Sequence, residues 1–155
     1  MITHHVSQHG FGVAEVPAGK IRAAIFQAER IIASVPPGTQ AVDCSPTKHL
    51  FVHGVYAREV FLPAGSWNTG KLHTHEDLLI IAKGRVTFYT ENGATTLEGP
   101  CMTTVKAMTK PLVHAHEDTW MYSAHVTPNG HTDPDAMERE LIVPCEIGEV
   151  PKCLS

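Results

Sequence analysis

Two histidines one residue apart, His73 and His75, are the strongest sign of chemistry in this sequence. On a β-strand, residues i and i+2 point to the same face, so both imidazoles would reach one point. Neutral imidazole is the commonest protein ligand for metal ions. Two histidines with one carboxylate form a type of metal site that leaves coordination positions open. The segment therefore predicts a metal centre whose third ligand is either Asp77 or Glu76.

Three further histidines and two oxygen-bearing side chains extend the set of candidate site residues. His114 and His116 would share one face of a strand, so one of the two is a candidate fourth metal ligand. His125 falls near the end of another strand-like segment and is a candidate for the same pocket. Glu59 is a candidate catalytic acid or base, and Tyr122 is a candidate source of a catalytic hydroxyl. Chance alone gives His-x-His pairs in a chain with eleven histidines, so the surrounding residues must decide.

The segments that must position these residues are mostly strand-like. Residues 19–35 carry the one clear helical pattern, and the Pro-Pro-Gly at 36–38 ends it. From residue 40, short apolar stretches alternate with turn residues, and the Asn-Gly at 92–93 is typical of a hairpin. Strands without intervening helices indicate an antiparallel sandwich or barrel. Residues 131–143 predict a short acidic helix, so the fold class is all-β with an N-terminal helix.

Length, composition and charge argue against several classes of protein. The chain has 155 residues, of which 43% are apolar and 18% charged, as in a single folded domain. With 12 basic and 16 acidic residues the net charge is −4, so we expect no general binding of nucleic acid. There is no long apolar run and no apolar N-terminal segment, so we expect neither a membrane span nor export. The four cysteines form no CxxC pair, and we expect them to be reduced in the cytoplasm.

The setting of the first histidine pair resembles the first sequence motif of the cupin superfamily. In that motif a Gly precedes His-x-His, and a Glu follows that is separated by six residues from a second Gly. Here Gly70 precedes the pair, and the segment from Asp77 to Gly84 has this spacing with Asp in place of Glu. The loop from His75 to Asp77 is shorter than in the family, which leaves Glu76 as an equal contender for the third ligand.

A second, fainter motif extends the resemblance over residues 46–143. It begins with the Gly-Pro at residues 99–100, and its histidine would be His114 or His116. Short stretches such as residues 54–59 resemble the sequences of small cupins encoded by phages and prophages, whose biochemical role is unassigned.

The resemblance implies a single double-stranded β-helix, the cupin jelly roll, over residues 46–143. Residues 1–45 would form an N-terminal arm and helix, and residues 144–155 a C-terminal tail. A single divalent metal ion (iron, manganese, nickel or zinc) would lie in the barrel, and the protein would act on or bind a small molecule. A homodimer is expected. Two alternatives are a metal-free module that binds a small ligand and a structural or interaction protein of a phage-related particle.

Overall fold

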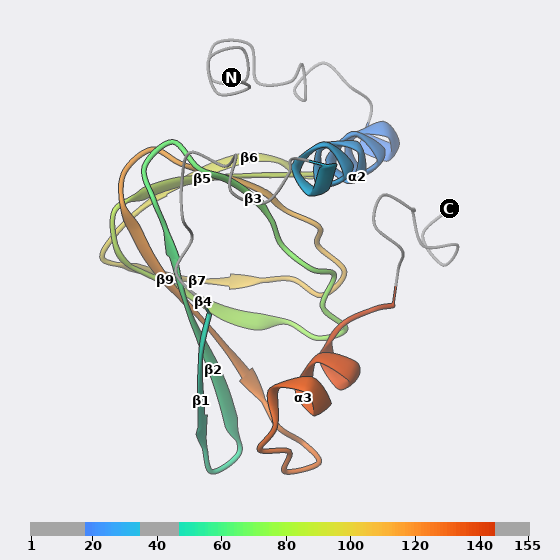
Figure 1. The fold of residues 1–155 in the computed structure, drawn as a ribbon, viewed down its shortest axis with the longest axis vertical. Helices are drawn as coiled ribbons and strands as arrows, with labels where there is room; N and C mark the ends of the chain where they lie inside the picture. The colour runs from blue at the N-terminus through green and yellow to red at the C-terminus, as the bar shows by residue number, and fades with distance from the viewer. Residues whose placement is uncertain (1–17, 35–46, 145–155) are drawn as a thin grey trace.

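Two antiparallel β-sheets face one another in the computed structural model, which describes residues 18–34 and 47–144 (Figure 1). One sheet has the strand order β1-β2-β9-β4-β7, and the other has the order β3-β8-β5-β6. From β2 onward the chain passes between the sheets at every connection except β5–β6, so strands distant in sequence become neighbours. This is the strand order of a jelly roll, and it confirms the predicted all-β jelly roll with an N-terminal helix.

The strands are short, and glycines or other turn residues separate most of them. The described strands are β1 (Lys48–Val52), β2 (Val55–Leu62), β3 (Trp67–Thr69), β4 (Asp77–Lys83), β5 (Arg85–Thr90), β6 (Gly93–Glu98), β7 (Cys101–Val105), β8 (Leu112–Ala115) and β9 (Thr119–Val126). The hairpin predicted at residues 92–93 joins β5 to β6, where Thr90 pairs with Gly93. The apolar core between the sheets contains Leu62, Leu79, Ile81, Val86, Val113 and Ala115.

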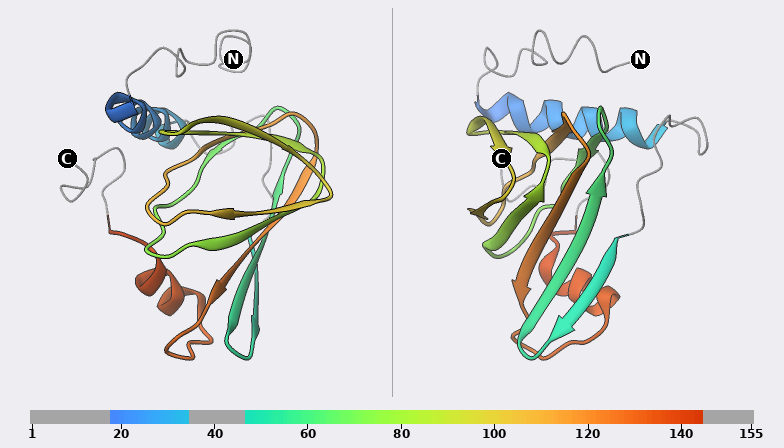
Figure 2. Two further views of the ribbon diagram at one scale, coloured as in Figure 1. Left: turned by 180° about the vertical axis from the view of Figure 1, so that it is seen from behind. Right: turned by 90° about the vertical axis from the view of Figure 1, so that its left-hand side faces the viewer.

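Helix α2 (Ala18–Ser34) covers the outer face of the β3-β8-β5-β6 sheet (Figures 1 and 2). Its buried residues Ile21, Ile25 and Ala28 recur at spacings of four and three and pack against Leu112 of β8. Val113, the next residue of β8, points the other way into the core between the sheets. The helix predicted at residues 19–35 is therefore confirmed, while the Pro-Pro-Gly after it lies outside the described residues.

Helix α3 (Pro134–Leu141) lies at the end of the barrel where β9 finishes (Figure 1). Asp133 caps it, because its side chain accepts a hydrogen bond of 2.9 Å from the backbone N–H of Ala136. Its buried Met137 and Leu141 pack against Tyr56 of β2. The acidic helix predicted within residues 131–143 is confirmed at Pro134–Leu141.

Three features bear on the remaining expectations about the chain. Cys101 is a free thiol beside the core, and the other cysteines lie outside the described residues. Within the described part of the chain, no helix combines the length and the apolar character needed to cross a membrane. Most of the predicted N-terminal arm and C-terminal tail also lies outside the described residues.

Candidate metal centre

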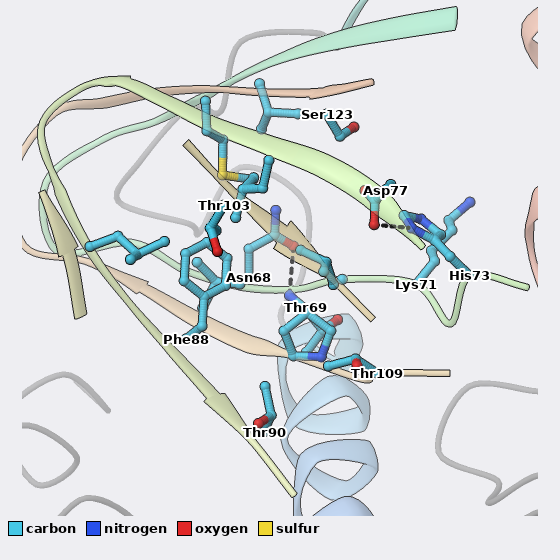
Figure 3. Close-up of a pocket in the computed structure, with 18 of the residues that line it drawn as sticks. Asn68, Thr69, Lys71, His73, Asp77, Phe88, Thr90, Thr103, Thr109 and Ser123 are labelled. Carbon is cyan, nitrogen blue, oxygen red and sulfur yellow. Dashed lines mark hydrogen bonds and ion pairs between the residues drawn. The ribbon is translucent and has the colours of Figure 1, made fainter. Parts of the chain in front are cut away.

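Three potential metal ligands, His73, Asp77 and His125, meet at the α3 end of the barrel. The two oxygens of Asp77 lie between the imidazoles: Oδ1 is 3.6 Å from His73 Nδ1, and Oδ2 is 3.8 Å from His125 Nε2. The two imidazole rings meet edge to face, with their centroids 4.9 Å apart. Figure 3 shows His73 and Asp77 side by side at one end of a cavity.

Strand register brings Asp77 and His125 together. Asp77 is the first residue of β4 and His125 is the last but one of β9. These strands are antiparallel neighbours, and the pair Leu78–Ala124 places Asp77 and His125 one step further along the same ladder. Because side chains alternate along a strand, both point to the inner face of the sheet, away from the exposed Leu78.

His73 reaches the cluster from the connection between β3 and β4. A β-bridge to Ile142, directly after α3, holds its backbone from one side. On the other side, the His73 carbonyl accepts a hydrogen bond of 2.8 Å from the N–H of Met108. Thr74 N–H donates to the carbonyl of Leu141 at 2.7 Å, which ties the same connection to α3. Two distant parts of the chain, Met108 and the end of α3, therefore fix this histidine.

The cluster is buried and incompletely hydrogen-bonded. The side chains of Asp77 and His125 are only 3% and 2% exposed, and that of His73 is 13% exposed. Asp77 Oδ1 and His73 Nε2 are buried atoms with no hydrogen-bond partner among the described residues. A buried polar atom without a partner is costly, and a bound ion or an ordered water is one way in which such an atom is satisfied.

The spacing of the cluster suits a metal ion. The candidate ligand atoms all lie within 4.8 Å of one another. Ligands about 2.1 Å from a tetrahedral metal ion are about 3.4 Å apart, close to the two distances measured from Asp77. A metal ion in such a site would have three protein ligands and at least one open position.

Burial keeps His125 in the form that a metal ion needs. Loss of solvation lowers the pKa of its imidazole to about 4; Asp77 opposes this effect, while His73 and Arg58 add to it. The ring is therefore neutral at pH 7 and has a lone pair to offer. Tyr56 stacks on the ring at a centroid distance of 5.9 Å, and the Tyr56 hydroxyl is 2.7 Å from His49 Nδ1. The stacked Tyr56, itself held by His49, therefore helps to fix the orientation of the His125 imidazole.

The cluster opens onto a cavity of about 470 Å³ between the two sheets (Figure 3). His73, Asp77 and Ser123 lie on its wall, together with Arg58 of β2. Phe88 lines it from the opposite sheet. The volume is in the range of sites for small molecules, and polar groups converge at one end.

His75 and Glu76, the other members of the predicted ligand segment, are both exposed. His75 Nδ1 contacts the hydroxyl of Thr74 at 2.7 Å, and neither His75 nor Glu76 belongs to the ligand cluster. The expectation that His73 and His75 reach one point is not met, because β4 begins only at Asp77 and the pair lies in a turn where i and i+2 do not share a face. Of the two carboxylates that the sequence left open, the structure brings Asp77 to the cluster.

His114 and His116 do share a face, as expected, but it is the outer face of the β3-β8-β5-β6 sheet. The His114 ring stacks on Trp67 at 4.2 Å and meets the His116 ring edge to face at 4.6 Å. His116 Nε2 lies 2.7 Å from the hydroxyl of Thr87. Burial, with a smaller effect of His116, lowers the pKa of His114 to about 4. Neither histidine lines the cavity, because the inner positions of β8 belong to Val113 and Ala115.

Glu59 and Tyr122, which the sequence offered as separate catalytic candidates, contact each other on the outer face of the other sheet. The Tyr122 hydroxyl donates to Glu59 Oε2 at 2.7 Å, and the Lys48 ammonium lies 2.5 Å from Glu59 Oε1. These two hydrogen bonds lower the pKa of Glu59, Lys48 contributing most. The inner positions beside them, Arg58 and Ser123, line the cavity instead. Arg58 is not among the predicted site residues, although alternation along β2 places it on the face opposite to Glu59.

Comparisons with known proteins give likenesses only among solved structures. No family model matches the sequence, and no curated protein matches it. A cupin-2 domain protein from Shewanella frigidimarina is similar at 9% identity over 56% of this chain and 84% of that chain, with a TM-score of 0.47. A cupin domain from Bordetella pertussis is similar at 12% identity over 58% of this chain and 99% of that chain, with a TM-score of 0.45.

An enzyme also appears among these structures. An acetylacetone dioxygenase from Acinetobacter johnsonii is similar at 14% identity over 55% of this chain and 65% of that chain, with a TM-score of 0.44. All three TM-scores lie below 0.5. The jelly-roll assignment therefore rests on the strand order, and these structures assign no function to this chain.

Proposed function

We propose that this protein binds one divalent metal ion through His73, Asp77 and His125 and holds a small molecule in the adjoining cavity. The observation that carries the proposal is the pair of buried, unpartnered atoms, Asp77 Oδ1 and His73 Nε2, in a cluster with the spacing of metal ligands. The cupin-like motif at residues 70–84 supports membership of the cupin superfamily. The association with phages stays a prediction.

Each residue of the cluster has a defined part in the proposed site. Asp77 supplies the one negative charge, and the two imidazoles supply neutral nitrogen ligands. When bound, a divalent ion there would polarise an oxygen atom of a ligand or lower the pKa of a bound water. Nitrogen and oxygen ligands in this number suit iron, manganese, nickel and zinc alike.

One observation favours a second function, a metal-free binding module. His125 Nε2 lies 3.2 Å from the Ser123 hydroxyl, so this nitrogen already has a partner inside the protein. In that case the cluster would serve as polar groups for hydrogen bonds to a ligand in the cavity. The two functions differ in whether the purified chain retains metal.

Elemental analysis of untagged protein tests the proposal. After loading with ZnCl₂ and desalting, the wild type should retain about one equivalent of zinc per chain. His73→Ala, Asp77→Asn and His125→Ala should each lower the retained zinc severalfold. His75→Ala is the matched control, because His75 is exposed and close in sequence but outside the cluster.

The control also separates this site from the one that the sequence predicted. If His75→Ala loses zinc as His73→Ala does, the ligand pair is His73 and His75 and the proposed cluster is wrong. If all variants retain zinc equally, the metal lies elsewhere, for example on other histidines of the chain. If the wild type retains none, the metal-free module is favoured.

A further inference from the structure

The inner face of the first sheet changes from charged to apolar along the cavity. Strand register places the side chains in rows, because residues two apart on one strand are about 7 Å apart on the same face. The row nearest α3 holds Asp77 and His125. Arg58 and Ser123 are partners in the next row, and Val60 and Met121 are partners in the third. Leu79 of β4 shares the second row with Arg58 and Ser123, so polar and apolar side chains are mixed there and the third row is apolar.

The facing sheet has a similar gradient. Phe88 and Val113 are partners on β5 and β8, and both line the cavity. Leu97 of β6 lines it further in, whereas Thr90 and Thr109 lie toward its polar end. The cavity thus offers hydroxyl and charged groups at one end and an apolar chamber at the other.

Among the described residues, Arg58 is the charged side chain of this cavity that has no hydrogen-bonded partner. Its side chain lines the wall and is only partly exposed. It makes no hydrogen bond or ion pair with any described residue, and its Nε atom is buried without a partner. Glu138 of α3 lies near enough for Arg58 to lower the pKa of that carboxyl group, but Glu138 is paired with Lys71. A half-buried guanidinium without a hydrogen-bonded carboxylate is costly, and its fork of N–H donors matches the two oxygens of a carboxylate.

The charges around the cavity favour an anionic ligand. Its lining has three basic side chains, Arg58, Lys71 and Lys106, and one acidic side chain, Asp77. Lys71 is already paired with Glu138 of α3. Lys106 is exposed, so within residues 18–34 and 47–144 Arg58 is the partly buried cation on the cavity wall that has no hydrogen-bonded partner. A metal ion on Asp77 would add further positive charge.

We propose that the cavity takes a small carboxylic acid with an apolar body, whose carboxylate pairs with Arg58. The apolar body lies against Val60, Met121 and Phe88, and the carboxylate lies one row from His73, Asp77 and His125. This inference deepens the proposed function and rests on its statement that the cavity holds a small molecule. The Arg58 contact itself needs no metal.

Calorimetric titration with three probes tests the inference on the wild-type protein. The probes are 3-phenylpropionate, its neutral amide 3-phenylpropanamide, and acetate. We expect 3-phenylpropionate to bind at least about tenfold more tightly than the amide, which lacks the charge that Arg58 pairs with. We expect a similar margin over acetate, which has no apolar body.

Variants then assign the effect to Arg58. Arg58→Met should weaken binding of 3-phenylpropionate at least about tenfold and leave binding of the amide nearly unchanged. Arg58→Lys, which keeps the charge but not the fork, should fall between Arg58→Met and the wild type. A urea unfolding curve of each variant shows that it is folded before titration.

Zinc retention, measured on the same variants, separates this inference from the metal site. Arg58→Met should keep zinc at the wild-type level, because Arg58 is not a ligand. Equal binding of 3-phenylpropionate and its amide, no binding of either, or unchanged binding in a folded Arg58→Met would each overturn the inference. The titrations are also repeated on metal-free protein. Loss of zinc in the variants of His73, Asp77 or His125 therefore does not affect the test of the Arg58 contact.

Discussion

Asp77 and His125 lie opposite one another on β4 and β9, with Asp77 Oδ2 3.8 Å from His125 Nε2 and both side chains almost fully buried. The distance is too long for a direct hydrogen bond and too short to leave the two groups independent. The other oxygen of Asp77 stands in the same relation to His73, at 3.6 Å. A carboxylate held this way between two imidazoles is spaced for an ion shared by all three groups.

Metal binding by this cluster should appear as added stability. A ligand that binds only the folded state at 100 times its dissociation constant adds about 2.7 kcal/mol to the free energy of unfolding. We therefore expect ZnCl₂ to shift the urea unfolding midpoint of the wild type upward, and EDTA to reverse the shift. Asp77→Asn, which keeps the shape but not the charge, should show little of this shift.

His75→Ala is the control for zinc binding that is unrelated to the cluster. It should show the full wild-type shift, because its side chain is exposed and does not belong to the ligand cluster. Equal stabilisation of Asp77→Asn and the wild type would mean that the zinc responsible binds outside this cluster.

Local pattern was enough to predict much of the fold. The spacing of Ile21, Ile25 and Ala28 marked one helix, and those residues form the apolar stripe that packs on Leu112. The Asn-Gly at residues 92–93 marked the β5–β6 hairpin, which depends only on neighbouring residues. These two elements could be predicted because turn residues and amphipathic periodicity act over only a few neighbouring residues.

The grouping of the site residues could not be predicted in the same way. His125 was a candidate, but its place beside Asp77 depends on a strand register between segments about 50 residues apart. His73 is held by Ile142, which follows α3 and is even further along the chain. The sequence motif suggested that His75 would join them, yet a two-residue period applies only within a strand, and β4 begins at Asp77. Non-local contacts therefore decided which histidines meet.

The outer-face histidine His114 should make the protein less stable in mild acid. Its pKa is lowered by burial to about 4 in the folded state, whereas the unfolded chain has the ordinary value of 6.5. As the pH falls, His114 takes up a proton in the unfolded chain before it does so in the folded protein, and this favours unfolding. The free energy of unfolding should therefore decrease as the pH falls from about 6.5 to 4. From pH 7.5 to pH 5 this amounts to about 2 kcal/mol of unfolding free energy.

Replacing His114 by a group that does not titrate should remove this loss. His114→Phe keeps an aromatic ring against Trp67 and should flatten the pH dependence of the urea unfolding free energy by about 2 kcal/mol over that range. His114→Gln, which also lacks a titrating group, should flatten it similarly, although it loses the ring contact. An unchanged slope in both variants would show that His114 is protonated equally in the folded and unfolded states.

Gly84, the last residue of the cupin-like motif, is needed for its backbone rather than for chemistry. It joins β4 to β5 with a φ of +93°, and a Cβ there would lie 2.4 Å from the carbonyl oxygen of Asp118. Gly84→Ala should therefore cost the strain of a left-handed residue, about 1–2 kcal/mol, and in addition the displacement of the Asp118 backbone. We expect a total loss of about 3 kcal/mol or more in urea unfolding free energy.

Gly54→Ala is the matched control for that loss, because Gly54 also has a positive φ, +78°, but no atom lies within 4 Å of a Cβ built there. This variant should lose only the strain term of about 1–2 kcal/mol. The difference between the two variants measures how closely β9 approaches the β4–β5 turn, since Asp118 directly precedes β9. Equal losses would mean that the β4–β5 turn can move away from Asp118 at little cost. Close packing of this turn would then have no part in fixing β9, the strand that carries His125.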